Sequence, residues 1–353
     1  MPASTRRTFL SWLAGGGVSL AALMKSARYG HAQENWDEVV AAAKKEGKVV
    51  FYNNLQPDGI EPILRKFRAR YPDISTEHIR LGSNPLNERF GTEYNAGRHL
   101  ADVVITIADQ NFYKGIESGW AEKWSPPEAK SYAPEWIVDD MLFTTQQLRE
   151  VIIWNTNLVK PGEEPKEWKD LFDPKWKGKV AMNPPWRSIP TQQLIVYWED
   201  KLKLGDTAQM FKDNNVRFFE GSAGIIQAVV RGDVAIAELT DLSVYGMLED
   251  GAPLGFVYPD SGFPLSVNRM FVAKHAPHPN AAKVLGNWLL SLEGQTALQE
   301  HAGLPVTHPD APPRKHLPAT KDLKNVMVDG ESIINPELQK KVVNHWRTVF
   351  GVR

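Results

Sequence analysis

The chain has 353 residues, 42% hydrophobic and 24% charged, which is typical of a folded protein long enough for two domains. It contains no cysteine, so disulfides, thiolate nucleophiles and cysteine-bound metals are excluded. The formal net charge is −1, and beyond the four bases of residues 1–32 there are 37 basic against 42 acidic residues, which disfavours nucleic-acid binding.

Residues 1–32 have the features of an export signal. Arg6 and Arg7 precede a weakly apolar stretch, residues 12–24, that is too short and too rich in glycine for a membrane span. Residues 30–32, Gly-His-Ala, supply small side chains where a signal peptidase cleaves. We expect a twin-arginine signal peptide and a mature chain in the periplasm or outside the cell, the alternative being a disordered basic tail.

The first third of the remaining chain predicts alternating strands and helices. Strands are expected at 48–52, 75–80 and 101–106, and the intervening segments carry apolar residues at helical spacing. This alternation indicates an α/β layer structure with right-handed crossovers. Small polar residues follow each strand.

The rest of the chain predicts a second set of similar elements. Strands are expected at 151–155, 179–182, 216–219, 233–239, 254–258 and 268–274, and helices at 168–172, 190–202, 225–230, 279–290, 292–301 and 336–349. Residues 216–245 are the most informative stretch. A strand leads into the turn 221–224, a helix closed by Gly232 and an apolar strand, a pattern typical of parallel sheets. Ligands of such sheets lie beyond the carboxyl ends of the strands, near helix N-termini.

The sequence carries none of the common catalytic or cofactor motifs. It has no phosphate-binding loop, no GxGxxG, no HExxH and no GxSxG. Glu220 and Glu238 are not paired at a catalytic spacing, and His278 is interpreted as a cap or surface residue. We therefore predict no catalytic residue, no cofactor and no metal site.

Polar residues recur after the expected strands of both halves, and two facing lobes would bring them to one cleft. Serines at helix N-termini offer N–H groups to an anion, an arginine pairs with carboxylate or phosphate, and aromatic rings cover an organic body. An ordinary turn, cap or core role is the alternative for each. The candidate ligand-binding residues are Asn53, Asn54, Ser83, Asp109, Trp186, Arg187, Ser188, Ser222, Ala223, Asp241 and Tyr245.

Several longer motifs carry a family resemblance. They include residues 80–89 (RLGSNPLNER), 168–181 (WKDLFDPKWKGKVA) and the HPNAAK and LLSLEGQ segments within 278–295. With them the chain resembles the extracellular solute-binding proteins of ABC importers, in the type II group that includes ferric-iron, spermidine/putrescine and thiamine receptors.

The resemblance implies an α/β, two-lobed periplasmic-binding-protein fold. Each lobe would be a mixed, mostly parallel sheet flanked by helices, and two hinge strands, 151–155 and 268–274, would join them. The N-terminal lobe would comprise residues 33–152 and 272–353, and the C-terminal lobe 153–271. A small-molecule solute would bind in the cleft, the lobes would close over it, and an ABC permease in the inner membrane would read the closed state. A monomer in the periplasm is the family expectation.

The ligand is expected to be organic and anionic. Ferric-binding members carry two adjacent tyrosines after the strand that corresponds to 233–239, whereas residues 240–245 here hold a single one, Tyr245. Ferric iron requires several anionic oxygen ligands. Arg187, Ser188 and Ser222 favour a phosphorylated or carboxylated solute. A ferric-iron receptor, a polyamine or zwitterion receptor selected by Asp109 and Asp241, and an enzyme on the same architecture stay open as alternatives.

Overall fold

The structure, a computed structural model, describes residues 35–241, 244–312, 318, 322–324, 326–328 and 335–352, so the expected signal peptide lies outside the described residues. The helices are α2 (Trp36–Glu46), α3 (Pro57–Arg70), α4 (Ser83–Asn95), α5 (Gln110–Glu117), α6 (Ile189–Val196), α7 (Thr207–Asp213), α8 (Ser222–Val230), α9 (Val244–Glu249), α10 (Pro279–Leu290), α11 (Leu292–Ala302) and α12 (Pro336–Phe350). The strands are β1 (Lys48–Asn53), β2 (Ser75–Arg80), β3 (Val103–Ile107), β4 (Ile137–Val138), β5 (Leu142–Leu148), β6 (Glu150–Asn155), β7 (Val180–Met182), β8 (Arg217–Phe218), β9 (Ile236–Thr240), β10 (Leu254–Val257), β11 (Phe263–Val272) and β12 (Val326–Val328). Within these ranges no helix has the length and hydropathy needed to cross a bilayer.

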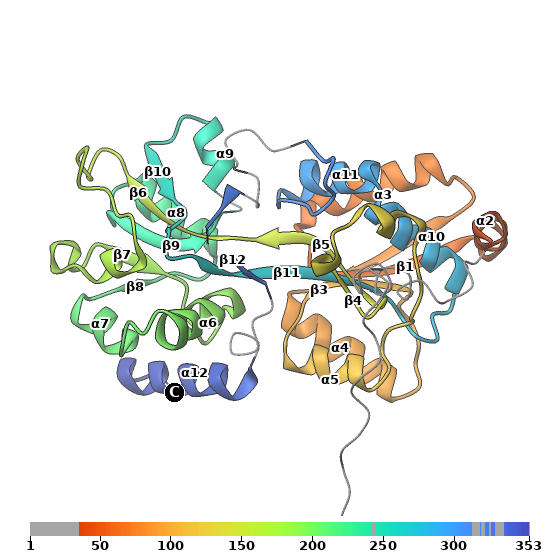
Figure 1. Cartoon of the computed structure of the whole chain (residues 1–353), viewed down its shortest axis with the longest axis horizontal. Coiled ribbons are helices and arrows are strands. Elements are labelled where there is room, and N and C mark those ends of the chain that lie inside the picture. The colour runs from red at the N-terminus through yellow and green to blue at the C-terminus, as the bar shows by residue number, and fades with distance from the viewer. Residues whose placement is uncertain are drawn as a thin grey trace, which may run out of the picture.

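The strands form two separate mixed sheets, and each sheet is the centre of one lobe (Figure 1). In the first lobe the order is β2-β1-β3-β11-β5-β4, and β12 pairs in parallel with the first residues of β11. β1 pairs in parallel with β2 and β3, while β11 runs antiparallel to β3 and β5. In the second lobe the order is β10-β6-β9-β7-β8, with β6 antiparallel to both of its neighbours.

Helices cover both faces of each sheet, because the strands present apolar side chains on both sides. In the first lobe one apolar cluster joins the sheet to α2, α3, α10 and α11, and a second joins it to α4 and α5. In the second lobe one cluster involves α6, α7 and α12, and the other α8 and α9. The expected two-lobed α/β architecture is thereby confirmed.

The two sheets divide the chain at other positions than we expected. β5 ends at Leu148 and β6 begins at Glu150, so the first crossing is at Arg149 rather than after residue 152. The return crossing lies in the first part of β11, because Phe263, Leu265 and Val267 belong to an apolar cluster of the second lobe, whereas residues 266–272 pair with β5 and β3 in the first sheet. The expected hinge segments, 151–155 and 268–274, thus lie within the sheets or end just beyond one.

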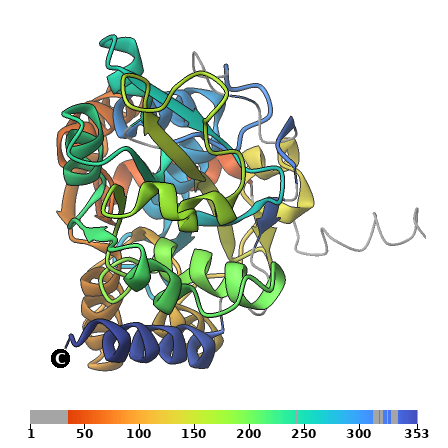
Figure 2. The same cartoon turned by 90° about the vertical axis from the view of Figure 1, so that its left-hand side faces the viewer.

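The C-terminal helix corrects a second expectation, since we had assigned residues 272–353 to the first lobe. The apolar face of α12 packs on α6 and α7 of the second lobe, and Trp346 is fully buried against Phe211 and Phe218. Figure 2 shows α12 lying along this lobe. The sequence predicted a helix at 336–349, but a local helical pattern carries no information about which distant surface the helix packs on.

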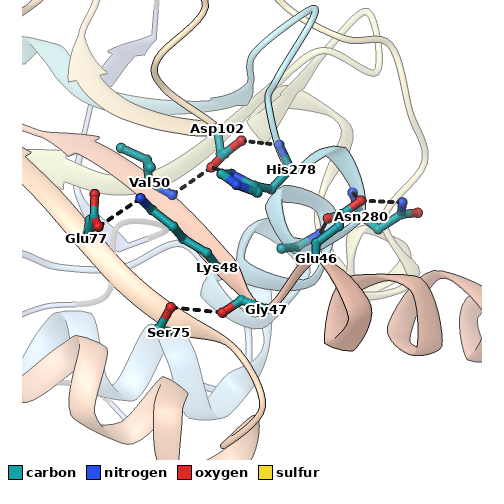
Figure 3. A network of polar contacts seen from close by, with 10 residues as sticks. Glu46, Gly47, Lys48, Val50, Ser75, Glu77, Asp102, His278 and Asn280 are labelled. Carbon is teal, nitrogen blue, oxygen red and sulfur yellow. Dashed lines mark hydrogen bonds and ion pairs between the residues drawn. The ribbon is translucent and has the colours of Figure 1, made fainter.

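A polar network around Asp102, the residue before β3, joins the start of α10 to β1 of the first sheet (Figure 3). The Asp102 carboxylate, which is fully buried, accepts hydrogen bonds from the backbone N–H groups of Val50 at 2.7 Å and His278 at 2.8 Å, and lies 2.9 Å from His278 Nδ1. The Glu46 carboxylate accepts N–H bonds from the first turn of α10, including one of 2.7 Å from Ala281. These contacts give His278 a structural role at the start of α10.

Candidate ligand-binding cleft

A cleft of about 490 Å³ lies between the lobes, with residues of both lobes in its walls. The first lobe contributes the start of α4 and the end of β3, and the second lobe contributes the segments before α6 and α8 and the end of β9. The lining residues are Gly82, Ser83, Asn84, Pro85, Ile107, Leu148, Asn183, Pro184, Arg187, Ser188, Ile189, Pro190, Glu220, Gly221, Ser222 and Thr240.

Three helix N-termini converge on this cleft. α4 starts at Ser83 in the first lobe, while α6 follows Ser188 and α8 starts at Ser222 in the second lobe. The Ser188 hydroxyl accepts a bond from the N–H of Thr191 at 3.3 Å and thus caps α6, whereas neither α4 nor α8 has a side-chain cap. The first-turn N–H groups and the dipoles of α4 and α8 therefore present positive potential to the cleft from opposite lobes.

The residue before α8 has a backbone conformation that favours glycine. Gly221 has φ of 82°, in the left-handed region, and its N–H donates to Asn183 Oδ1 at 2.9 Å. This bond joins the loop after β7 to the start of α8. The Ser222 and Thr240 hydroxyls lie 3.5 Å apart, so hydroxyls from two neighbouring segments meet at the cleft wall.

The charged side chains among the lining residues are one arginine and one glutamate. Arg187 Nε lies 3.2 Å from Glu220 Oε1, and both side chains are mostly exposed, at 63% and 71%. An exposed pair of this kind contributes little to folding and is readily exchanged for a ligand group. Arg187 can therefore turn its guanidinium toward a bound anion at small cost.

Four of the eleven predicted residues line the cleft: Ser83, Arg187, Ser188 and Ser222. Two others lie near these residues but point elsewhere. The half-buried Trp186 ring packs edge-on against Phe218, with centroids 5.1 Å apart, which explains why the predicted aromatic contact is absent from the lining. Ala223 is exposed on α8 outside the lining.

The predicted residues of the first lobe other than Ser83 lie behind its wall. Asn53 is fully buried and its Oδ1 accepts the N–H of Leu55 at 3.3 Å, so it shapes the turn after β1. Asp109 caps α5 by accepting the N–H of Phe112 at 2.8 Å, and burial raises the pKa of its carboxyl. Asn54 donates to Ser83 Oγ at 2.9 Å and so touches the cleft through that serine.

Asp241 and Tyr245 do not reach the cleft, contrary to expectation. Both are fully buried, and Asp241 Oδ2 accepts bonds from the hydroxyls of Tyr245 at 3.2 Å and Tyr258 at 2.8 Å. Burial raises the pKa of Asp241 to about 6, and burial together with the nearby Asp241 raises the pKa of Tyr245. The chain after β9 turns inward, so these residues form a core polar cluster.

Sequence reasoning missed a pair of buried carboxyls next to this cluster. Glu150 on β6 and Glu238 on β9 are diagonal neighbours on one face of the second sheet, and each is at most 1% exposed. Burial, followed by the charge of Glu238, raises the pKa of Glu150, and burial raises the pKa of Glu238 to about 7. Their separation of 88 residues leaves no local motif from which the pair could be recognised.

Comparisons with known proteins agree with the two-lobed architecture. Iron uptake protein A1 of Synechocystis sp. is 25% identical over 331 residues, covering 86% of this chain and 88% of that protein. Spermidine/putrescine-binding periplasmic protein 1 of Haemophilus influenzae is 25% identical over 215 residues, covering 57% of this chain and 54% of that protein. Among solved structures, iron-bound HitA from Pseudomonas aeruginosa has a TM-score of 0.73 at 19% identity, with 86% of this chain and 99% of HitA covered.

A further solved structure, AfuA from Actinobacillus pleuropneumoniae with bound fructose-6-phosphate, has a TM-score of 0.71 at 21% identity and covers 87% of this chain and 99% of its own. The family model described as bacterial extracellular solute-binding protein matches residues 98–327, well over half of the chain. Membership implies a location in the periplasm. The chain therefore belongs to the bacterial extracellular solute-binding proteins, and it is the solute-binding component of an ABC transporter.

Proposed function

We propose that this protein captures a small organic anion, phosphorylated or carboxylated, in the interlobe cleft and delivers it to an ABC permease. The observation that carries the proposal is the convergence of the N-termini of α4, α6 and α8 on one cleft. Helix N-termini favour anions, and Arg187 adds a guanidinium whose fork matches carboxylate or phosphate.

The composition of the cleft wall supports an organic ligand over ferric iron. The lining contains a single carboxylate, Glu220, which faces Arg187, and Tyr245 is buried elsewhere. Ferric iron favours several anionic oxygens together, and no group of three or more histidine, aspartate or glutamate side chains suited to a metal occurs in the described part of the chain. The iron bound by HitA and the fructose-6-phosphate bound by AfuA give the two contrasting ligand classes to test.

A polyamine receptor is supported less well by the same wall. Recognition of several ammonium groups needs acceptors, yet Asp109 caps α5 and Asp241 bonds two tyrosines. The apolar surface of Pro85, Ile107 and Pro190 suits the body of an organic solute.

Ligand capture is proposed to close the lobes. A solute that contacts α4 on one side and α8 on the other makes both sets of contacts only when the lobes approach, so it shifts the population toward the closed state. The permease would then recognise the closed form. We further propose that the protein acts as a monomer without catalytic turnover and is exported by the twin-arginine route.

Thermal unfolding with a ligand panel tests the proposal. The panel contains fructose 6-phosphate, inorganic phosphate, citrate, spermidine and a ferric salt, each at a series of concentrations. A ligand present at a hundred times its Kd adds about 2.7 kcal/mol of stability, which raises Tm by about 4 °C for a chain of this size. Stabilisation by ferric salt alone, with a tyrosinate absorption band, would refute the anion assignment.

A further inference from the structure

A chain of side-chain amides runs from the strands that approach the crossing to the wall of the cleft. Gln146 on β5 and Asn268 on β11 are paired across the two strands, and Asn268 Nδ2 donates to Gln146 Oε1 at 3.1 Å. Asn268 Oδ1 accepts from Asn54 Nδ2 at 2.9 Å, and the same Asn54 nitrogen donates to Ser83 Oγ at 2.9 Å. Gln146 and Asn268 are buried, whereas Ser83 lines the cleft.

The direction of each bond follows from the one before it. Gln146 presents its oxygen to Asn268, while its buried Nε2 has no hydrogen-bond partner among the described residues, and Asn268 turns its NH₂ group toward Gln146 and its oxygen toward Asn54. Asn54 then presents its NH₂ group to both Asn268 and Ser83, and its buried Oδ1 has no hydrogen-bond partner in the described part of the chain. Ser83 Oγ thus accepts a bond from within the protein, and its own proton has no acceptor among the residues that the structure describes.

The consequence is a hydroxyl of fixed polarity at the start of α4. If Asn54 rotated by half a turn, its oxygen would face Ser83 and take the serine proton, leaving the Ser83 oxygen as an acceptor toward the cleft. Asn268 opposes that rotation, because two amide oxygens would then face each other. The register of the β11–β5 ladder shifts between Asn268 and Arg269, next to this amide chain.

We propose that Asn268 and Asn54 are positioning residues that hold Ser83 as a hydrogen-bond donor to the ligand and so select for an acceptor group. This inference rests on the proposed function, because it assigns the serine to an anionic oxygen of the solute. It also makes the ligand contact of the first lobe depend on β5 and β11, the strands next to the crossings.

The test is a double-mutant cycle between Asn268→Leu, which keeps the number and branching of side-chain heavy atoms without a polar atom, and Ser83→Ala. Calorimetry measures Kd for inorganic phosphate, fructose 6-phosphate and citrate, and fructose serves as the neutral comparison. Ser83→Ala is expected to weaken anion binding by roughly tenfold to a hundredfold, as for loss of one bond to a charged group. Asn268→Leu is expected to weaken it at least about fivefold, and to add little once Ser83 is absent.

The matched control is Asn155→Leu. Asn155 is likewise a buried strand asparagine, with its Nδ2 bonded to Val229 O at 2.7 Å, but it lies in the second lobe outside the cleft lining. Both leucine variants should lower Tm. Only Asn268→Leu should raise the Kd of the anions and reduce the ratio of the affinities for fructose 6-phosphate and fructose. If Asn268→Leu fails to fold, Asn54→Ala at a half-buried position removes the same bond, and its effect on Kd should likewise disappear when Ser83 is absent.

The binding measurements distinguish the positioning role of Asn268 from the proposal of an anionic ligand. Anion binding that is insensitive to Asn268→Leu, or effects of the two substitutions that simply add, would overturn the positioning role and leave the proposed function intact. A wild-type protein that binds none of the three anions would overturn the anionic ligand and the positioning role together.

Discussion

Replacement of Glu238 by glutamine should stabilise the protein at neutral and alkaline pH. Glu150 and Glu238 face each other in the core of the second lobe, and none of their four carboxylate oxygens has a hydrogen-bond partner when both are ionised. The free-energy cost of ionising two adjacent buried carboxyls is high, so one of them keeps its proton. Glutamine keeps the shape, removes the titration and offers an NH₂ group to Glu150.

The sign and size of this stability difference follow from the pKa of Glu238, which burial raises from 4.5 to about 7. A carboxyl whose pKa is higher in the folded state contributes most stability at low pH and loses it as the pH rises from about 4.5 to about 7. At 1.36 kcal/mol per pKa unit the loss is about 3 kcal/mol. The variant should therefore match the wild type near pH 4.5 and exceed it by up to about 3 kcal/mol at pH 8, or about 4 °C in Tm.

Urea and thermal unfolding between pH 4.5 and 8.5 measure this difference directly. Asp241, whose pKa is raised to about 6 by burial, titrates in both proteins and cancels in the comparison. Glu220→Gln, at an exposed carboxylate, is the control and should leave the pH slope unchanged. Parallel pH profiles for Glu238→Gln and wild type, or a variant less stable at every pH, would refute the reasoning.

Three other predictions address the cleft, the C-terminal helix and helix packing. Arg187→Ala should weaken binding of an anion by about 2 kcal/mol in calorimetry, and an unchanged Kd would remove the guanidinium from the site. Trp346→Ala should cost about 3–5 kcal/mol of stability in urea unfolding, because the ring is fully buried in the second lobe, and a cost below 1 kcal/mol would contradict that packing. Gly59→Ala should destabilise by about 1–3 kcal/mol, since its new Cβ would lie 2.2 Å from a backbone oxygen of α11. Gly246→Ala, which meets nothing within 4 Å, should instead stabilise by about 0.5–1 kcal/mol, and equal effects of the two substitutions would contradict the geometry.

Much of the fold could be predicted from the sequence because most elements have strong local signals. α2 has such signals at both ends, since the Asn35 side chain caps its start and Gly47, with φ of 68°, ends it. Gly232 likewise follows α8 in the left-handed conformation, with φ of 79°. Such signals act within one or two turns of the chain, and they are independent of tertiary packing.

The parts that were missed depend on contacts between distant segments. β5 was not predicted because its residues 144–147 are Thr-Thr-Gln-Gln, a polar run with no alternation of apolar and polar residues, although every residue of the strand is buried. Burial of these polar groups is compensated by partners far away in sequence, such as Asn268 for Gln146. The lobe of α12 was assigned wrongly for the same reason, since its partners precede it by more than a hundred residues.

The candidate site shows the same division between local and distant signals. Ser83, Ser188 and Ser222 could be identified because a serine at the start of a helix lies beyond a strand end, where clefts form. Their role in ligand binding stays a prediction. The topological rule did not distinguish loops that face the cleft from the loop after β9, which turns Asp241 into the core.

The attachment of α12 to the second lobe gives the molecule a useful asymmetry. α2, near the start of the described chain, packs in the first lobe, so α2 and α12 are attached to different lobes (Figure 1). A donor fluorophore at an exposed position of α2 and an acceptor on α12 would report lobe closure as a change in energy transfer, with no alteration of the cleft. A protein labelled at these two positions would therefore serve as a sensor of its solute.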